Sequence, residues 1–371
     1  MENNIPETEG IKYAGSKLKI LPYILQEVKS LPDVKHILDG FSGTTRVSQA
    51  FYKSGYDVTC NDISYWSETF GKCYLQADKP ATYYQPIIDH LNALEGKLGW
   101  FSEHYGAQDL NNGKYPFQLH NTMKLDAIRE EIENLNLSEI DKQVLLTSLI
   151  LALDKVDNSL GHQVSYLSKW SARSYHTLEL KVPLITYPKL GKTEVMRRDI
   201  IETIKDKSFD LAYLDPPYGS NNYKMPSSRV RYSSYYHLWT TIIKNDHPKL
   251  FGKAQRREDT RDLVSTSAFE DYKKDENGKL NALNELERLI HIIHANYILL
   301  SYSSGGIISK NELIEILQKN GTLIHSQEID YKKNVMANMK WTNEWSAKSS
   351  SNQEYLFLLK KIKHYGNNRS I

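Results

Sequence analysis

The sequence predicts an α/β fold that is interrupted by a mostly helical insertion, and three observations support this prediction. Short apolar runs that read as strands end in an acid at Asp39, Asp62 and Asp215. The first two runs flank a segment with helical spacing, which gives the strand, helix, strand order typical of α/β proteins. Residues 71–191 lack this order, and the apolar residues between 128 and 153 recur at helical intervals.

Six short strands are expected along the chain. The first covers 34–38 and leads through a glycine turn into a helix with Val47, Ala50 and Phe51 on one face. The others are expected over 57–60, 209–214, 296–302, 322–325 and 354–359, with a helix over 310–319 and the last strand antiparallel to its neighbour. This order predicts one domain from residues 1–70 and 192–371 and an inserted domain over 71–191.

The composition fits a globular protein in a reducing compartment. Of its 371 residues, 40% are hydrophobic and 25% are charged, which is enough apolar material for a sizeable core. Cys60 and Cys73 are too few for a disulfide framework or a zinc cage, so a cytoplasmic location and no metal site are expected. The polar N-terminus is unlike a signal peptide, and no apolar run approaches the roughly 20 residues of a membrane helix. No membrane association is therefore expected.

Two windows of the sequence combine basic and aromatic side chains. Residues 165–198 contain seven Lys or Arg against two Glu, and residues 224–257 contain eight Lys or Arg against one Asp. Cations neutralise phosphates and aromatic rings stack on unpaired bases, so the pattern is typical of a nucleic-acid surface. A solvated lysine-rich face is the alternative.

Asp39 and Asp62 end strands at the edge where open α/β sheets bind ligands. Gly40 and Gly43 let the backbone approach a ligand closely, and the Asp39 carboxylate can hold an amine or a hydroxyl. The alternative for Asp39 is a helix cap. Asp62 is placed to accept hydrogen bonds from ribose hydroxyls, with an ordinary Asn-Asp turn as its alternative.

The tetrapeptide Asp215-Pro216-Pro217-Tyr218 follows the third expected strand. Each proline fixes φ and lacks an N–H, so the backbone there is stiff. A carboxylate beside a fixed carbonyl provides two acceptors suited to one NH₂ group. Tyr218 adds a flat face on which a base can stack. The alternative is a proline turn without a further role.

These motifs and their order resemble the D12, or Dam-like, class of DNA adenine-N6 methyltransferases of the α group. Tyr13-Ala14-Gly15-Ser16-Lys17 is similar to the first motif of that family, in which Trp usually stands in place of Tyr13. Asp39-Gly40-Phe41-Ser42-Gly43 resembles its cofactor loop, Asn61-Asp62 its acidic motif, and Asp215 to Tyr218 its catalytic motif. The resemblance covers residues 11–70 and 195–245 well.

The resemblance implies a Rossmann-like sheet of the S-adenosylmethionine-dependent methyltransferases, with target recognition in the insertion over 71–191. It implies that Asp39 holds the methionine amino end of S-adenosylmethionine, Asp62 the ribose and Asp199 the adenine. Tyr13 and Lys17 would border the cofactor. The further cofactor candidates from the same motifs are Ala14, Gly15, Phe41, Ser42, Gly43, Ile63 and Asp215.

The implied reaction is methyl transfer to N6 of an adenine flipped out of duplex DNA. Asp215 and the Pro216 carbonyl would accept both N–H bonds of the amine and turn its lone pair toward the methyl group, while Tyr218 stacks on the base. The expected DNA contacts are Lys169, Arg173, Lys192, Arg197, Tyr223, Arg229, Arg231 and Tyr235.

Two alternatives to this function stay open at the level of sequence. Cytosine-N4 methyltransferases use a similar motif, more often with Ser in the position of Asp215. A catalytically silent DNA-binding relative that keeps the fold is the second. A restriction-modification setting, with a cognate endonuclease acting on the same site, and an orphan regulator are equally consistent with the sequence.

Overall fold

The computed structural model describes residues 5–219, 232–261, 267–331 and 352–362 of the chain. The chain divides into two compact units. Unit 1 comprises Met1–Pro22, Ser42–Arg198 and Val230–Thr266, and unit 2 comprises Tyr23–Phe41, Asp199–Arg229 and Ser267–Ile371. This division differs from the predicted boundaries, because residues 42–70 share a unit with the expected insertion over 71–191. The reason is packing: Trp66 and Phe70 belong to the same buried core as the long helices of that region.

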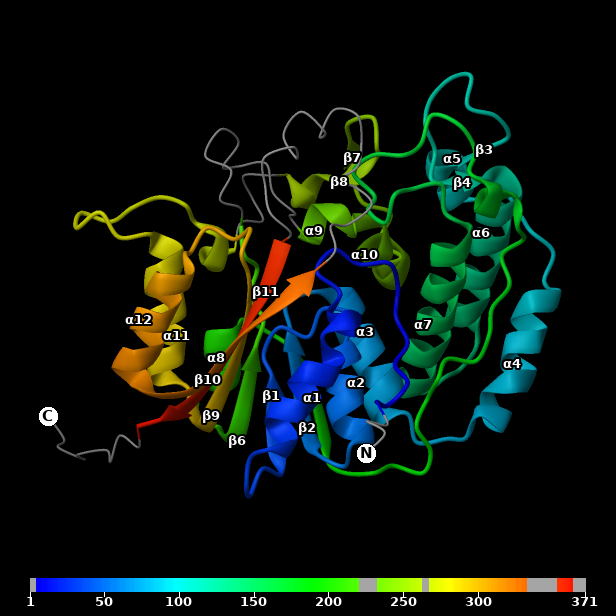
Figure 1. The fold of residues 1–371 in the computed structure, drawn as a ribbon. Helices are drawn as coiled ribbons and strands as arrows, with labels where there is room; N and C mark the ends of the chain where they lie inside the picture. The colour runs from blue at the N-terminus through cyan, green and yellow to red at the C-terminus, as the bar shows by residue number, and fades with distance from the viewer. Residues whose placement is uncertain (1–4, 220–231, 262–266, 332–351, 363–371) are drawn as a thin grey trace, which may run out of the picture. The chain divides into compact units, whose positions relative to one another are not determined.

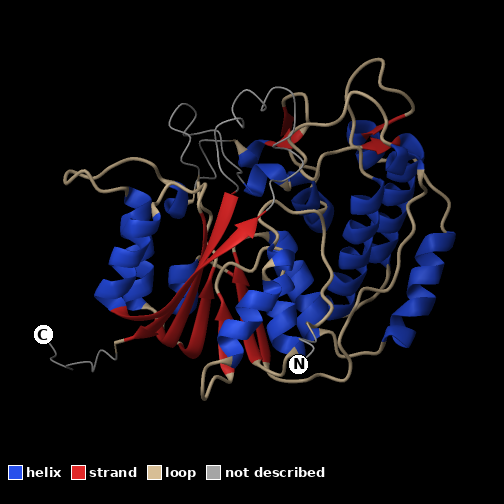
Figure 2. Cartoon of the chain, in the orientation of Figure 1, coloured by secondary structure: helices blue, strands red, loops and turns tan. Residues whose placement is uncertain are grey.

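Unit 2 is built on a twisted and mostly parallel sheet (Figure 2). Its strands lie in the order β10-β11-β9-β6-β1. The parallel neighbours are β1 (His36–Asp39), β6 (Ser208–Leu214) and β9 (His294–Ser303). The strand β11 (Asn352–Lys361) runs antiparallel between β9 and β10 (Gly321–Tyr331), which confirms the predicted antiparallel last strand.

The helices of unit 2 cover this sheet with their apolar faces. The helices α11 (Asn281–Ile292) and α12 (Lys310–Asn320) lie side by side (Figure 1). Ser309 and Glu312 form a capping box that begins α12, which satisfies backbone donors of its first turn. Leucines of both helices share one buried core with β6, β9 and β11. The remaining helical segments are α8 (Ile200–Ile204), η5 (Ala268–Glu270) and α1 (Leu21–Lys29), whose first two residues belong to unit 1.

Unit 1 contains a parallel strand pair, β2 (Asp57–Asp62) and β5 (Thr193–Arg197). The strand β5 was not predicted, because its exposed Glu194 and Arg197 hide the apolar alternation on which strand prediction depends. The other elements before β5 are η1 (Lys17–Lys19), α2 (Arg46–Lys53), α3 (Tyr65–Gly71), the π-helical turn η2 (Lys72–Gln76), α4 (Ala81–Ala93), α5 (Trp100–Tyr105), β3 (Gly106–Ala107), β4 (Phe117–Gln118) and η3 (Ala172–Tyr175). The elements after β5 are α9 (Tyr232–Tyr235), α10 (His237–Lys244), β7 (Leu250–Phe251), β8 (Arg256–Arg257) and η4 (Glu258–Thr260).

Two long helices form the centre of the helical region in unit 1 (Figure 1). The expected helical run over 128–153 is divided between α6 (Leu119–Asn134) and α7 (Glu139–Val156). The break arises because Ser138 caps α7, accepting a hydrogen bond from the backbone N–H of Asp141 at 3.1 Å. Most side chains of α7 are buried on every face, so packing rather than amphipathicity holds this helix.

The described residues therefore form the α/β class that the sequence predicts. Cys60 and Cys73 are buried free thiols. Among the helices that the structure describes, none has the length and apolar character needed to cross a membrane.

Candidate active site

Acidic side chains gather at the carboxyl end of the sheet in unit 2. Asp39 ends β1 opposite Tyr213 of β6, and the N–H of Gly40 donates to the Tyr213 carbonyl at 3.0 Å. Burial raises the pKa of Tyr213 well above its usual value, and the charges of Asp215, Asp39 and Glu354 raise it further. Three carboxylates thus act on one phenol, which makes this edge strongly electronegative.

A carboxylate cluster of this kind is also a potential cation site. Among the described residues, however, no group of three or more His, Cys, Asp or Glu side chains has the arrangement needed to hold a metal ion.

The Asp215 to Tyr218 corner follows directly after β6. Pro216 is buried, whereas Asp215, Pro217 and Tyr218 are half-buried and reachable from solvent. The hydroxyl of Tyr218 lies within hydrogen-bond reach of Asp215 Oδ1 and of Glu354 Oε1, the latter at 2.8 Å. Burial raises the pKa of Tyr218 well above its usual value, with further increases from Asp215 and Glu354.

The backbone of this corner is fixed by contacts from β9 and the loop after it. The Tyr218 carbonyl accepts hydrogen bonds from the Tyr302 hydroxyl at 3.1 Å and from the Ile307 N–H at 2.9 Å. The rings of Tyr218 and Tyr302 pack with centroids 4.8 Å apart. These contacts therefore fix the main chain of the corner, in addition to the φ angles that its two prolines fix.

The other candidates in unit 2 lie at turns beside strands. Asp199 is exposed and caps α8, its Oδ1 accepting from the Ile201 N–H at 2.8 Å. Phe41 packs edge to face on Phe269, with centroids 5.2 Å apart. The helix cap considered for Asp39 does not occur, because α2 begins at Arg46 with Thr45 in the cap position.

In unit 1, Asp62 is held in one orientation by the loop that precedes α2. Its Oδ2 accepts from the Gly43 N–H at 2.8 Å, and its Oδ1 accepts from the N–H and hydroxyl of Ser64 at 2.9 and 2.6 Å. Burial raises the pKa of Asp62, and these hydrogen bonds oppose the rise. Next to it, Ile63 is 70% exposed, an apolar side chain that is available to a ligand.

The N-terminal motif packs on aromatic residues of α9 and the turn after it. Tyr13 stacks on Tyr232 and Tyr236, with centroids 5.2 and 4.7 Å apart. The Ala14 N–H donates to the Tyr236 hydroxyl at 2.7 Å, and Lys17 is buried. Gly15 has φ of +81°, a conformation that favours glycine.

The loop that follows β1 meets this motif at Gly43, which has φ of +50°. A Cβ at Gly43 would lie 3.2 Å from the Tyr13 ring, so a larger residue would disturb both. The neighbouring Ser42 donates from its hydroxyl to the Asn61 carbonyl at 3.0 Å. Tyr13, Gly43 and Asp62 are thus brought together. Tyr236 is a further residue of this cluster that no motif indicated.

The DNA candidates that the structure describes differ in their surroundings. Lys169 and Lys192 are exposed. Arg197 is exposed, lies over the Tyr65 ring at 4.0 Å and donates to Glu68 at 3.0 Å. Tyr235 is half-buried and packs against His162, with centroids 4.8 Å apart.

Arg173 is engaged inside unit 1. Its guanidinium pairs with buried Asp157 at 2.7 Å and donates to the carbonyls of Asp157 and Ser159. This arrangement fixes the chain after α7 and differs from the expected phosphate contact. Tyr223, Arg229 and Arg231 lie outside the described residues.

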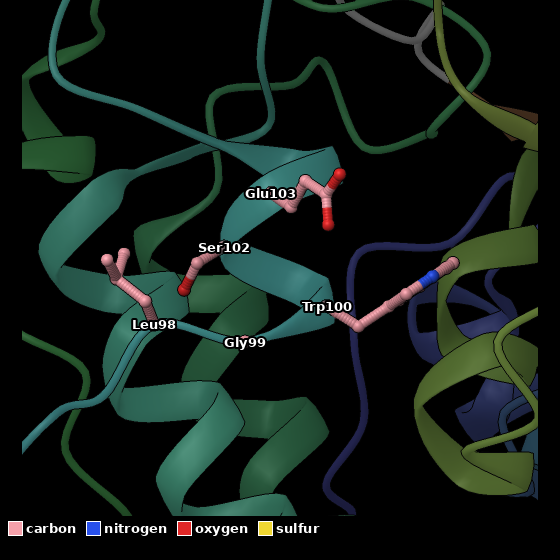
Figure 3. A pocket seen from close by; sticks show the side chains of 5 residues that line it. All are labelled: Leu98, Gly99, Trp100, Ser102 and Glu103. Carbon is pink, nitrogen blue, oxygen red and sulfur yellow. The ribbon is translucent and has the colours of Figure 1, made fainter.

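A surface pocket of about 500 Å³ lies at the start of α5 in unit 1 (Figure 3). Leu98, Gly99, Trp100, Ser102 and Glu103 line it. Trp100 also stacks on His104 and His247, with centroids 4.5 and 5.0 Å apart. None of the residues expected to bind cofactor or DNA lines this pocket. The pocket is therefore not part of the predicted cofactor or DNA site.

The mostly parallel sheet, with acids at the carboxyl ends of β1 and β6, defines a Rossmann-like α/β protein. Residues 13–316 match the family described as D12 class N6 adenine-specific DNA methyltransferase. The chain belongs to this family.

Curated relatives carry related names. Modification methylase StsI of Streptococcus sanguinis is 28% identical over 352 residues, covering 90% of this chain and 50% of that protein. Modification methylase LlaI of Lactococcus lactis subsp. lactis is 26% identical over 336 residues, covering 83% of this chain and 49% of that protein. Type II methyltransferase M.NlaIII of Neisseria lactamica is 27% identical over 362 residues, covering 95% of this chain and 99% of that protein.

The chain thus spans about half the length of StsI and LlaI and nearly all of M.NlaIII. Among solved structures, the hMettl16 catalytic domain overlaps 92% of this chain and 71% of that chain at 9% identity. Its TM-score of 0.30 is too low to support a conclusion about fold or function.

Proposed function

We propose that this chain transfers a methyl group from S-adenosylmethionine to the N6 amine of an adenine flipped out of duplex DNA. The observation that carries the proposal is the half-buried Asp215 to Tyr218 corner at the end of β6, with its fixed backbone and its carboxylate. Family membership and the names of the relatives support it. Those names also support a restriction-modification setting, with a cognate endonuclease of the same site as partner.

The donor set fits S-adenosylmethionine. The cofactor is a cation with an amino group, and the Asp39 carboxylate near Tyr213 suits positive charge. We assign Asp39 to the amino end, Asp62 to the ribose and Asp199 to the adenine. Bound there, the cofactor supplies an electrophilic methyl group. The bordering contacts we propose are Tyr13, Ala14, Gly15, Lys17, Phe41, Ser42, Gly43 and Ile63.

The protein's own part in the reaction is to orient the amine. N6 of adenine is a weak nucleophile, because its lone pair is delocalised into the ring. Asp215 and the Pro216 carbonyl accept the two N–H bonds, which favours a tetrahedral nitrogen with its lone pair directed at the methyl carbon. Tyr218 stacks on the extruded base, since chemistry on this atom requires the base to leave the helix.

The DNA surface that we propose uses Lys169, Lys192 and Arg197 for phosphates, and Tyr235 for the target strand. Tyr223, Arg229 and Arg231 remain candidates from the sequence, and residues 71–191 remain the proposed recognition region. Arg173 is left out of this surface, because its guanidinium is committed to Asp157.

The test is incubation of the chain with tritiated S-adenosylmethionine and duplex DNA, followed by nucleoside analysis. Label is expected in N6-methyladenine. Asp215→Ala should lower transfer about a hundredfold to a thousandfold, because one of the two acceptors for the amine is lost, while the Kd for S-adenosylmethionine measured by calorimetry stays within a fewfold.

Each other outcome has a definite meaning. Label in N4-methylcytosine would replace the adenine assignment with the cytosine one. DNA binding without label would identify a silent relative. Full activity in Asp215→Ala would refute the assignment of the corner. Exposed Glu328→Gln on β10 is the matched control and should transfer as wild type does.

A further inference from the structure

Glu354 is a buried acid in the middle of the candidate active site of unit 2. It lies on β11 and is 7% exposed. Its Oε1 accepts from the Ser301 hydroxyl at 2.7 Å and lies 2.8 Å from the Tyr218 hydroxyl. Burying a carboxylate costs free energy unless hydrogen-bond donors compensate it. The position of Glu354 beside the proposed catalytic corner therefore indicates a role there.

The Tyr218 hydroxyl lies between two carboxylates and has one proton to give. It contacts Asp215 Oδ1 and Glu354 Oε1. A phenol donates only one hydrogen bond, so the two acids compete for the same donor. When the Tyr218 proton points at Asp215, it occupies an oxygen that the target amine needs.

We propose that Glu354 is a positioning residue for methyl transfer. It accepts the Tyr218 hydroxyl when Asp215 binds the amine, which frees the Asp215 oxygen and holds the Tyr218 ring in its stacking orientation. Ser301 fixes the Glu354 carboxylate for this exchange. The inference rests on the proposed function and adds to it a residue that lies 136 positions from Tyr218 in the chain.

The experiment is a double-mutant cycle on the full chain with single-turnover methyl transfer. Glu354→Leu should lower the transfer rate about tenfold, because the Tyr218 hydroxyl then stays on Asp215. Tyr218→Phe removes this competing hydroxyl together with the contact that holds the ring, so it should cost no more than Glu354→Leu. The double variant should match Tyr218→Phe, because Glu354 then has no hydroxyl to accept, and the two losses should not multiply. Glu354→Gln keeps an acceptor oxygen and should recover most of the rate.

A second readout does not depend on activity. With ¹³Cζ-labelled tyrosine, the signal missing in Tyr218→Phe belongs to Tyr218, and it should shift in Glu354→Leu. Glu328→Gln should leave this signal and the transfer rate unchanged.

Multiplicative rate losses in the cycle, or an unshifted Tyr218 signal, would overturn the role of Glu354 while leaving the proposed function intact. A wild-type chain that methylates no DNA would overturn the proposed function, and the role of Glu354 in it.

Discussion

At the scale of single residues, the buried and half-buried carboxylates of this chain differ in pKa, because they receive hydrogen bonds from different donors. Asp62 receives its hydrogen bonds from Gly43 and Ser64, which are neutral, and burial raises its pKa. Burial alone would also raise the pKa of Asp246, but hydrogen bonds and charge from Arg257 and Lys244 outweigh it and lower the pKa to about 2. The first arrangement suits a ligand site, whereas the second stabilises the fold.

Asp246 gives a testable pH dependence. Its pKa is about 2 in the folded chain, against 3.8 as the usual value. A depressed carboxyl pKa stabilises the folded state above the unfolded pKa, and that contribution is lost as pH falls from about 4 to about 2. Asp246→Asn should therefore lower the free energy of unfolding by about 1–2 kcal/mol at pH 7, after allowance for solvent screening.

Urea unfolding at pH 7, 4 and 3 measures this effect. The difference between wild type and Asp246→Asn should narrow at the lowest pH, whereas exposed Glu276→Gln should differ little from wild type throughout. A difference that stays constant across this range would show that the ion pair with Arg257 is not its source.

At the scale of elements, the candidate site residues lie at the ends of strands and helices, which position their side chains. The strand β6 ends at Leu214, and the two prolines after Asp215 set the direction of the chain into Tyr218. Asp199 has two possible roles, because it caps α8 and belongs to the proposed cofactor site. Substitution can separate these roles.

Asp199→Ser keeps a capping oxygen, and Asp199→Ala removes it. The Ser variant should unfold in urea as wild type does, whereas the Ala variant should lose about 1 kcal/mol. Both should bind S-adenosylmethionine about tenfold more weakly by calorimetry. Ala has no acceptor, and Ser has a single oxygen, which the cap engages, in place of the second carboxylate oxygen of Asp199. Wild-type affinity in the Ser variant would reduce Asp199 to a helix cap.

At the scale of the whole molecule, charge distribution bears on the proposed DNA contacts. Lys169 and Lys192 are exposed in the basic window of unit 1, whereas the half-buried Arg173 pairs with Asp157. Contacts to phosphates release counterions from DNA, so the affinity depends on the salt concentration. The slope of log Kd against log salt concentration is about 0.9 per contact.

The double variant Lys169→Gln/Lys192→Gln should bind a long duplex more weakly and reduce the slope of log Kd against log salt concentration by about 2. Fluorescence anisotropy over a salt series measures both. Lys279→Gln/Lys319→Gln is the matched control, because both lysines pair with Glu287. An unchanged slope in the first pair would remove these lysines from the DNA surface.

Which site residues could be predicted from the sequence depends on whether they belong to a motif. Tyr13, Gly43 and Asp62 were each named as candidates because each belongs to a recognisable motif, and the structure places them close together. The strand β5 was missed because its exposed charges conceal the alternation. Tyr236 and Glu354 carry no motif, and only their contacts reveal them.

The sequence by itself determined the α/β class, the acids that end the strands and the stiff corner from Asp215 to Tyr218. These features depend on neighbours in the chain, such as proline rings that fix φ and apolar residues that alternate along a strand. Only the tertiary structure decided that Glu354 reaches the Tyr218 hydroxyl, that Tyr236 supports Tyr13 and that Arg173 pairs with Asp157. The reason is physical: these contacts join residues of different elements, and which partners meet depends on how the elements pack.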